Sequence, residues 1–287
     1  MLTVPEPEVT YVIGDLHGDS PRALRLLERL GIVSVDAGSL VRWTAPPGTC
    51  VVQLGDQLDS AVRGEGRSPD WEALPDTSCV ELFTRLARVA ADAGGRVISL
   101  LGNHELMNVR GDHGYVSAKS LAMSGGAPGR TEMMRPGSDF VREHLATRPV
   151  IVKVGSVVMV HAGVLSRHLR CLSRVNGEVA RWLDSAAPMS ADVAGAVFDD
   201  AGLLWTRRYV DEDQDAVTED LRRTLRALAA TEVCVGHTVV PSIMRAAGGG
   251  AWLCDTGISR AIGGETVQVL RMTRGGARDV VQVTFGG

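Results

Sequence analysis

Residues 9–18 read Val-Thr-Tyr-Val-Ile-Gly-Asp-Leu-His-Gly, an apolar run that ends in glycine and then delivers a carboxylate and an imidazole. A short β-branched run bounded by a turn signal is typical of a buried strand. Asp15 and His17 follow this strand two positions apart, so both side chains can point to the same side of the chain. The stretch therefore predicts a sheet whose strand ends carry reactive groups.

The same arrangement returns five more times along the chain. In each case a short apolar run is followed by an acid, an amide or an imidazole next to a turn signal. These pairs are Val51–Leu54 with Gly55-Asp56, Val97–Leu101 with Gly102-Asn103-His104, Val157–Val160 with His161-Ala162-Gly163, Val233–Val235 with Gly236-His237-Thr238, and Trp252–Cys254 with Asp255-Thr256-Gly257. Such runs indicate strands of a sheet that is covered on both faces.

Helical patterns separate several of these strands. The patterns are Pro21–Leu30, Leu82–Ala93 behind a Ser78-x-x-Glu81 capping box, and Glu219–Ala230. Strands and helices alternate with no convincing linker, so we expect a single α/β domain over residues 1–287. Two stretches rich in glycine and polar residues, 61–77 and 124–138, are expected to be irregular loop insertions.

Composition limits the partners and the compartment. The net charge of −4 leaves no broad basic face, which argues against nucleic acid and acidic membrane surfaces as partners. No stretch approaches the roughly 20 apolar residues that span a bilayer, and the N-terminus lacks the pattern of a secretory signal. The 5 cysteines are odd in number and show no Cys-x-x-Cys spacing. We therefore expect buried free thiols in a cytoplasmic protein.

The strand-end groups form a set of metal ligands without a thiolate. Carboxylate, amide oxygen and imidazole together suit manganese, iron or zinc rather than copper(I) or an iron–sulfur cluster. Six such groups exceed one tetrahedral site but fit two adjacent ions that share a bridging carboxylate. The six candidates are Asp15, His17, Asp56, Asn103, His161 and His237. Three other histidines, His113, His144 and His168, match no motif and are expected in loops or on the surface.

Five of these motifs, in this order, resemble the phosphoprotein phosphatase branch of the calcineurin-like metallophosphoesterases. They are Gly14-Asp15-Leu16-His17-Gly18, Gly55-Asp56-Gln57-Leu58-Asp59, Gly102-Asn103-His104-Glu105, His161-Ala162-Gly163 and Gly236-His237-Thr238. Within that branch, residues 103–109 and Trp205-Thr206-Arg207 look like the Shewanella-like, bacterial-type group. The resemblance implies two mixed β-sheets packed as a sandwich and flanked by helices.

The resemblance also implies roles for these residues. Asp15 and His17 would hold the first metal ion, Asp56 would bridge, and the remaining three ligands would hold the second. Manganese is the expected metal, with iron or zinc as alternatives. A hydroxide bound by both ions would attack phosphorus in line. His104 would protonate the leaving group, and Asp59 would fix the tautomer of His104.

One position departs from the family pattern. The second motif normally continues after the aspartate with arginine and glycine, whereas this chain has Ser60-Ala61. That arginine would bind the phosphate oxygens bidentately, and a serine cannot replace its charge. Arg207 is the expected phosphate-binding residue here, and Arg63 is a possible stand-in for the missing arginine.

The expected function is metal-dependent hydrolysis of phosphomonoesters on a phosphoprotein, with phosphotyrosine and phosphoserine or phosphothreonine both open, and another small phosphoester is an alternative substrate. A dinucleotide polyphosphate hydrolase is the enzymatic alternative, because it uses the same metal motifs. A non-catalytic binding scaffold on the same fold is an alternative from another class. A scaffold should have lost ligands or His104, and this chain keeps all seven positions.

Overall fold

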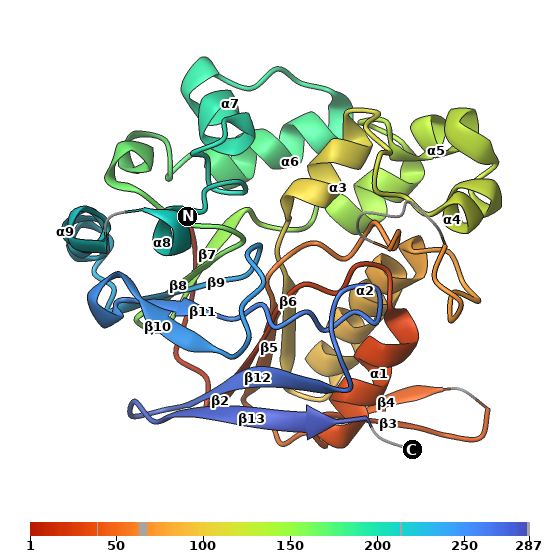
Figure 1. Ribbon diagram of the computed structural model, residues 1–287, viewed down its shortest axis with the longest axis horizontal. Helices are drawn as coiled ribbons and strands as arrows, with labels where there is room; N and C mark the ends of the chain where they lie inside the picture. Colours follow the sequence, from red (N-terminus) through yellow and green to blue (C-terminus); the bar gives the residue numbers. More distant parts are fainter. Residues whose placement is uncertain (39, 63–67, 213, 286–287) are drawn as a thin grey trace.

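The computed structural model describes residues 1–38, 40–62, 68–212 and 214–285, and two mixed sheets lie at its centre (Figure 1). One sheet has the strand order β1-β7-β8-β9-β11-β10 and the other β13-β12-β2-β5-β6. The strands of the first are β1 Leu2–Val4, β7 Ile151–Val154, β8 Val157–Val160, β9 Glu232–Val235, β11 Ala251–Leu253 and β10 Met244–Ala246. Those of the second are β13 Arg278–Thr284, β12 Thr266–Thr273, β2 Val9–Ile13, β5 Thr49–Gln53 and β6 Arg96–Ser99.

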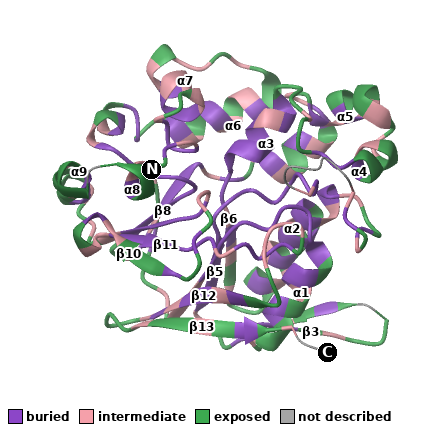
Figure 2. Cartoon of the chain, in the orientation of Figure 1, coloured by how far each residue is buried: buried purple, intermediate pink, exposed green. Residues whose placement is uncertain are grey.

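Alternation along the central strands decides how the sheets pack. In β5, Val52 belongs to the apolar cluster between the sheets, whereas Val51 packs with the helices on the outer face. In β8, Met159 points between the sheets and Val158 lies in the other outer cluster. Because successive side chains of a strand point to opposite faces, each central strand is buried on both sides. The predicted sandwich is confirmed, and Figure 2 shows these strands as the buried centre of the molecule.

Helices cover the outer faces of the sandwich. The longer ones are α1 Ser20–Arg29, α2 Thr77–Asp92, α6 Val175–Ser185, α7 Ala191–Phe198 and α9 Gln214–Ala227. Shorter segments are α3 Asn103–Val109, α4 Ala118–Met123, α5 Gly126–Met134, α8 Arg208–Asp211, the π-helix Val141–Leu145 and the 3₁₀ turns Ser166–Arg170 and Ala247–Gly249. A two-stranded hairpin, β3 Val33–Val35 with β4 Val41–Trp43, lies beside α1 and α2 (Figure 1).

Two local predictions need correction. Helix α2 begins at Thr77 with Asp76 at its N-cap position, so Ser78 lies inside the first turn, where its Oγ forms a hydrogen bond of 2.7 Å with Ser20 Oγ. The segment 124–138 is not irregular, because helix α5 occupies Gly126–Met134. In the other expected insertion, residues 61–62 and 68–76 form no regular helix or strand, and 63–67 lie outside the described residues. The single domain and its insertions stay predictions.

The prediction of buried free thiols is confirmed. All five cysteines are buried and free. In the described part of the chain, every helix is too short or too polar to cross a membrane. Among the histidines that match no motif, His168 is buried, with 2% of its surface exposed, so its expected surface position is wrong. His113 and His144 are half-buried.

Candidate metal centre

The six predicted ligands meet at one end of the two sheets. Strands β2, β5 and β6 run parallel to one another, as do β8, β9 and β11. The carboxyl ends of parallel neighbours lie at the same edge of a sheet, so the residues that follow them converge. Asp15 follows β2, Asp56 follows β5, Asn103 follows β6, and the two histidines His161 and His237 follow β8 and β9.

One group of donor atoms lies around His17. The side chains of His17, Asp56 and His104 are buried and place one ligand atom each within 4.8 Å of the others. His17 Nδ1 donates to the carbonyl oxygen of Leu58 at 3.1 Å, which leaves Nε2 as the nitrogen that could bind a metal ion. That Nε2 lies 4.0 Å from Oδ2 of Asp15. Both members of the predicted first metal site therefore point to the same place.

A second group lies around His161. Asp56, His161 and His237 again place their ligand atoms within 4.8 Å of one another. His161 Nδ1 lies 2.8 Å from the carbonyl oxygen of Leu54, so its Nε2 is the atom left to bind a metal ion. This Nε2 is 3.3 Å from Oδ2 of Asp56 and 2.9 Å from Oδ1 of Asn103. Asp56 thus belongs to both groups, as expected of a bridging carboxylate.

The loops that carry these groups adopt strained backbones. Among the described non-glycine residues, His17, Asp56, Asp59 and His237 have φ angles of 38°, 53°, 72° and 64°. Left-handed φ values at such residues cost free energy and persist only where the surroundings hold them. The loop after β6 passes close to Asp56 at Gly102, where an added Cβ would lie 2.1 Å from Oδ1 of Asp56. A residue larger than glycine would displace Asp56.

Glu105 holds the loop after β5 in place, a role that the sequence motifs do not indicate. Its carboxylate accepts hydrogen bonds from the backbone N–H groups of Asp56, Gln57 and Leu58 at 2.9, 2.8 and 3.2 Å. It also accepts one from Gly102 N at 2.7 Å. Glu105 is the next residue after His104 in the third motif, and its burial signals this role. One carboxylate therefore ties two of the ligand-bearing loops together.

The centre is rich in buried negative charge. Burial, followed by repulsion from Asp255 and Asp56, raises the pKa of Asp15 well above its ordinary value. Burial also raises the pKa of Asp255 to about 6. For Asp56, burial alone would raise the pKa, but the surrounding histidines, His161 first, hold it well below its ordinary value. Clustered carboxylates that raise one another's pKa values form a site that favours cations.

Asp255 is a further acid at this edge, and although the sequence places it at a strand end, no motif marks it as a ligand. It is 1% exposed, and its Oδ1 accepts a hydrogen bond from Gly257 N at 2.9 Å. Its Oδ2 is buried and has no hydrogen-bond partner among the described residues. An unsatisfied buried carboxylate oxygen beside Asp15 is consistent with a centre built to hold metal ions.

His104 and Asp59 form the predicted pair. Nδ1 of His104 lies 2.6 Å from Oδ2 of Asp59, and Asp59 is fully buried. The imidazole therefore turns its Nε2 toward Asp56, whose Oδ2 lies 3.8 Å away. The ring of Tyr115 meets His104 edge to face, with 5.0 Å between ring centroids. This arrangement gives His104 one fixed nitrogen and leaves the other facing the centre.

The predicted phosphate-binding arginines fare differently. Arg207 is exposed, and its Nη1 donates to Thr238 Oγ1 at 3.1 Å, directly beside the candidate ligand His237. Arg63 lies outside the described residues. Ser60, at the position of the missing arginine, is fully buried, and its Oγ donates to the carboxylate of Glu72. The serine therefore does not present its hydroxyl as a substitute phosphate donor.

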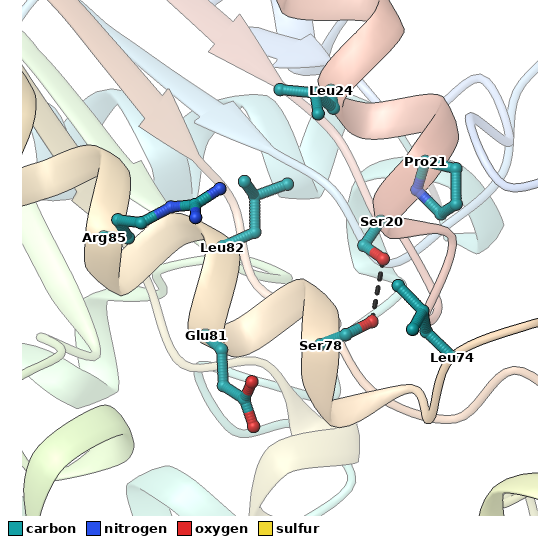
Figure 3. A pocket seen from close by; sticks show the side chains of 8 residues that line it. All are labelled: Ser20, Pro21, Leu24, Leu74, Ser78, Glu81, Leu82 and Arg85. Carbon is teal, nitrogen blue, oxygen red and sulfur yellow. Dashed lines mark hydrogen bonds between the residues drawn. The ribbon is translucent and has the colours of Figure 1, made fainter. Parts of the chain in front are cut away.

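A separate cavity of about 470 Å³ lies between α1 and α2 (Figure 3). Its lining includes Leu24, Leu74 and Leu82, together with Ser20 and Ser78, which are hydrogen-bonded to each other. None of its lining residues is a predicted site residue. The cavity is therefore distinct from the candidate metal centre.

A two-sheet sandwich with His, Asp and Asn side chains gathered at its strand ends defines a metallophosphoesterase. Residues 9–241 match the family model of the calcineurin-like phosphoesterases, and the chain belongs to this family. The predicted resemblance is confirmed.

Two relatives match most of this chain. An uncharacterized protein of Schizosaccharomyces pombe is 30% identical over 98% of this chain and 82% of its own length. Shewanella-like protein phosphatase 2 of Arabidopsis thaliana is 27% identical over 72% of this chain and 59% of its own. This chain therefore spans about three fifths of the Arabidopsis protein.

Solved structures agree on the fold. The crystal structure of a cold-active protein-tyrosine phosphatase from a psychrophilic Shewanella species superimposes with a TM-score of 0.75 at 21% identity. The match covers 100% of this chain and 82% of that one. A protein serine/threonine phosphatase of Saccharomyces cerevisiae matches with a TM-score of 0.61 at 15% identity. Both structures share the fold of this chain.

Proposed function

We propose that this protein hydrolyses phosphomonoesters with two divalent metal ions held between its sheets. The observation that carries the proposal is the position of Asp56, whose carboxylate belongs to both groups of ligand atoms. A carboxylate shared in this way can bridge two ions, and the paired arrangement suits displacement at phosphorus. Asp15 and His17 hold one ion, Asn103, His161 and His237 hold the other, and Asp56 serves both.

Manganese fits this donor set, with iron or zinc as alternatives. The ligands are carboxylate, amide and imidazole, and all five cysteines lie buried as free thiols. The unsatisfied Oδ2 of Asp255 and the raised pKa of Asp15 support the same view, because both reflect negative charge that a cation would compensate. Bound ions would lower the pKa of a water molecule and neutralise charge on the phosphoryl group.

His104 acts as the general acid in this proposal. Its Nδ1 proton is held by Asp59, so a second proton on Nε2 is the one available to the leaving oxygen. Asp59 also stabilises the imidazolium form through its negative charge. In the same proposal Arg207, which is anchored beside His237, binds the non-bridging phosphate oxygens.

The proposed substrate is a phosphorylated protein. Support comes from the relatives named as Shewanella-like protein phosphatases and from the fold shared with tyrosine and serine/threonine phosphatases. The second candidate is a small phosphoester, including a dinucleotide polyphosphate. It is favoured by Ser60, which stands in place of a phosphate-binding arginine and is bonded to Glu72.

A substrate panel tests the proposal. Purified protein is depleted of metal, reloaded with manganese, iron or zinc, and assayed on phosphotyrosine peptide, phosphoserine and phosphothreonine peptides, diadenosine tetraphosphate and an aryl phosphate. Metal-dependent hydrolysis of a phosphopeptide supports a protein phosphatase, and preference for the dinucleotide supports the second candidate. Binding of a phosphopeptide without turnover under any metal would identify a scaffold and overturn the enzymatic proposal.

A further inference from the structure

A chain of buried hydrogen bonds runs outward from His104. His104 Nδ1 lies 2.6 Å from Asp59 Oδ2, and the other oxygen, Asp59 Oδ1, accepts from Asn108 Nδ2 at 2.8 Å. Asn108 Oδ1 in turn accepts from Arg130 Nε at 2.9 Å. Arg130 forms two further hydrogen bonds with Asp76, at 2.7 and 2.9 Å. The chain thus links the candidate acid to a buried ion pair in three steps.

Arg130 fixes which way the amide of Asn108 faces. Since Arg130 Nε–H can only donate, Asn108 must turn its carbonyl oxygen toward the arginine and its NH₂ group toward Asp59. The same NH₂ group also donates to the backbone carbonyl of His104 at 3.0 Å. With Asn108 as donor on one side and His104 Nδ1 on the other, both oxygens of Asp59 accept hydrogen bonds.

Asp76 fixes the backbone of Asp59. Its Oδ2 accepts the N–H of Asp59 at 2.9 Å, and its Oδ1 accepts the hydroxyl of Ser120 at 2.9 Å. Asp76 occupies the N-cap position of α2, where an aspartate ordinarily accepts a helix N–H, yet its side chain makes no capping bond. The carboxylate of Asp76 therefore binds Arg130 and Asp59 instead of the N–H groups of α2.

The buried ion pair and the strained backbone of Asp59 both cost free energy, so stability does not explain this network. Arg130 and Asp76 are both 0% exposed, and a buried ion pair adds little stability over apolar residues of the same volume. Asp59 has a φ of 72°, a conformation that persists only where neighbours over-determine it. Asn108 contacts the side chain of Asp59 and Asp76 contacts its backbone, so together they hold this strained residue from two sides. We therefore interpret the network as one that fixes the orientation of Asp59 rather than one that adds stability.

We propose that Asn108, Arg130 and Asp76 are positioning residues that hold Asp59, and through it His104, in the orientation for protonating the leaving group. The inference rests on the proposed general-acid role of His104. Asn108 lies in α3, Arg130 lies in α5, and Asp76 directly precedes α2. The segment that contains α5 thus supplies the arginine on which the orientation of the acid depends.

Asn108→Leu is the main test, because it keeps the branched shape of the side chain and removes both the donor to Asp59 and the acceptor for Arg130. Turnover is measured on a simple alkyl phosphate and on p-nitrophenyl phosphate, whose leaving group needs little protonation. We expect kcat for the alkyl phosphate to fall about 10- to 100-fold, the loss that a small misplacement of a catalytic group causes. We expect kcat for the aryl ester, both KM values and the metal content to stay within about threefold of wild type.

Asn176→Leu is the matched control. Asn176 in α6 also uses its whole amide, accepting from Val150 N and Ile151 N at 3.0 and 3.2 Å and donating to Ile151 O at 2.8 Å. It lies outside the network of Asp59. The control should lower the thermal midpoint and leave the ratio of alkyl to aryl turnover unchanged. If Asn108→Leu does not fold, Asn108→Ser removes the same amide with a smaller polar side chain.

A double variant isolates the route through Asp59. In the Asp59→Asn background, Asn108→Leu should cost less than about twofold more on the alkyl phosphate, because the residue through which it acts is already changed. Additive losses, or equal losses on both esters from Asn108→Leu, overturn the positioning role. His104→Asn, measured in parallel, distinguishes failure of the general-acid role from failure of the positioning role. If it shows no preference between the esters, the general-acid role fails and the positioning role fails with it; if it does and Asn108→Leu does not, only the positioning role fails.

Discussion

Oδ2 of Asp56 lies 3.3 Å from Nε2 of His161, which brings together residues that follow β5 in one sheet and β8 in the other. The same carboxylate oxygen lies 3.8 Å from Nε2 of His104. This position between the two groups of ligand atoms makes Asp56 the residue on which both proposed metal sites depend.

Asp56→Asn should therefore empty both sites together. An amide oxygen carries no charge and is a poor bridge between two cations, so the metal content should fall from two ions per chain to less than one. Elemental analysis after dialysis measures this. Asp279→Asn, which removes an exposed acid paired with Arg271, is the control and should retain both ions. Loss of a single ion from Asp56→Asn would contradict the bridging role.

His104→Asn should lower kcat for an alkyl phosphate by about 10²- to 10⁴-fold, the usual range for general acid–base catalysis. The loss should be smaller for an aryl phosphate, because a phenoxide leaves with little help from a proton. Single-turnover rates on the two esters provide the comparison. Equal losses on both esters would argue against a general acid at this position.

Arg207→Ala should lower kcat/KM by about 10- to 100-fold, because charge-assisted hydrogen bonds to a phosphate contribute roughly 1.5–3 kcal/mol. The neighbouring Arg208 pairs with Glu212 through Nε at the protein surface, so Arg208→Ala is the matched control and should stay near wild type. Steady-state kinetics on one aryl phosphate are sufficient. Wild-type behaviour of Arg207→Ala would assign phosphate binding to another residue.

Ser60→Arg tests the departure from the family pattern. The side chain of Ser60 is fully buried and faces Glu72, and a Cβ at Gly18 would lie 2.8 Å from its own Cβ. An arginine there has no room to reach a phosphate without moving the loop. We therefore expect Ser60→Arg to lower the thermal midpoint and to give no gain in kcat/KM. A gain in activity would show that the loop adapts and that the lost arginine can be restored.

His168 makes stability depend on pH. Burial, and then the charge of Arg167, lower the pKa of His168 to about 4. Its Nδ1 accepts a hydrogen bond from Leu165 N at 3.1 Å, which a protonated nitrogen cannot do. Between pH about 6.5 and about 4 the unfolded chain binds the proton that the folded chain refuses, so stability is complete above this window and falls as the pH is lowered.

The size of this effect can be measured by urea unfolding of the metal-free protein at pH 7.5 and pH 5. His168 should contribute a loss on the order of 1–2 kcal/mol between these values. His168→Gln should reduce the difference between the two pH values by that amount, although it lowers stability at both. An unchanged difference would mean that His168 can accept a proton in the folded state.

The sequence by itself was sufficient to predict the strands that end in candidate ligands, and the groups at those ends. The apolar run of β2 with Asp15 and His17 just beyond it is a local pattern, and neighbouring parallel strands of one sheet bring their carboxyl ends to the same edge. Local sequence is therefore enough to predict six candidate ligands in separate motifs, without their contacts in the fold. The pairing of His104 with Asp59 was predicted from the family resemblance, and the 2.6 Å contact agrees with it.

Only the tertiary structure decided what surrounds that centre. Helix α5 contains glycine and proline, which disfavour helices, so the local sequence predicted an irregular segment. The buried pairing of Arg130 with Asp76 joins residues 54 positions apart, and no local pattern predicts such a contact. The direction of Ser60 toward Glu72 is likewise a matter of packing between loops. Local patterns determine where a strand ends, whereas the partner of a buried charge depends on which distant segments fold against it.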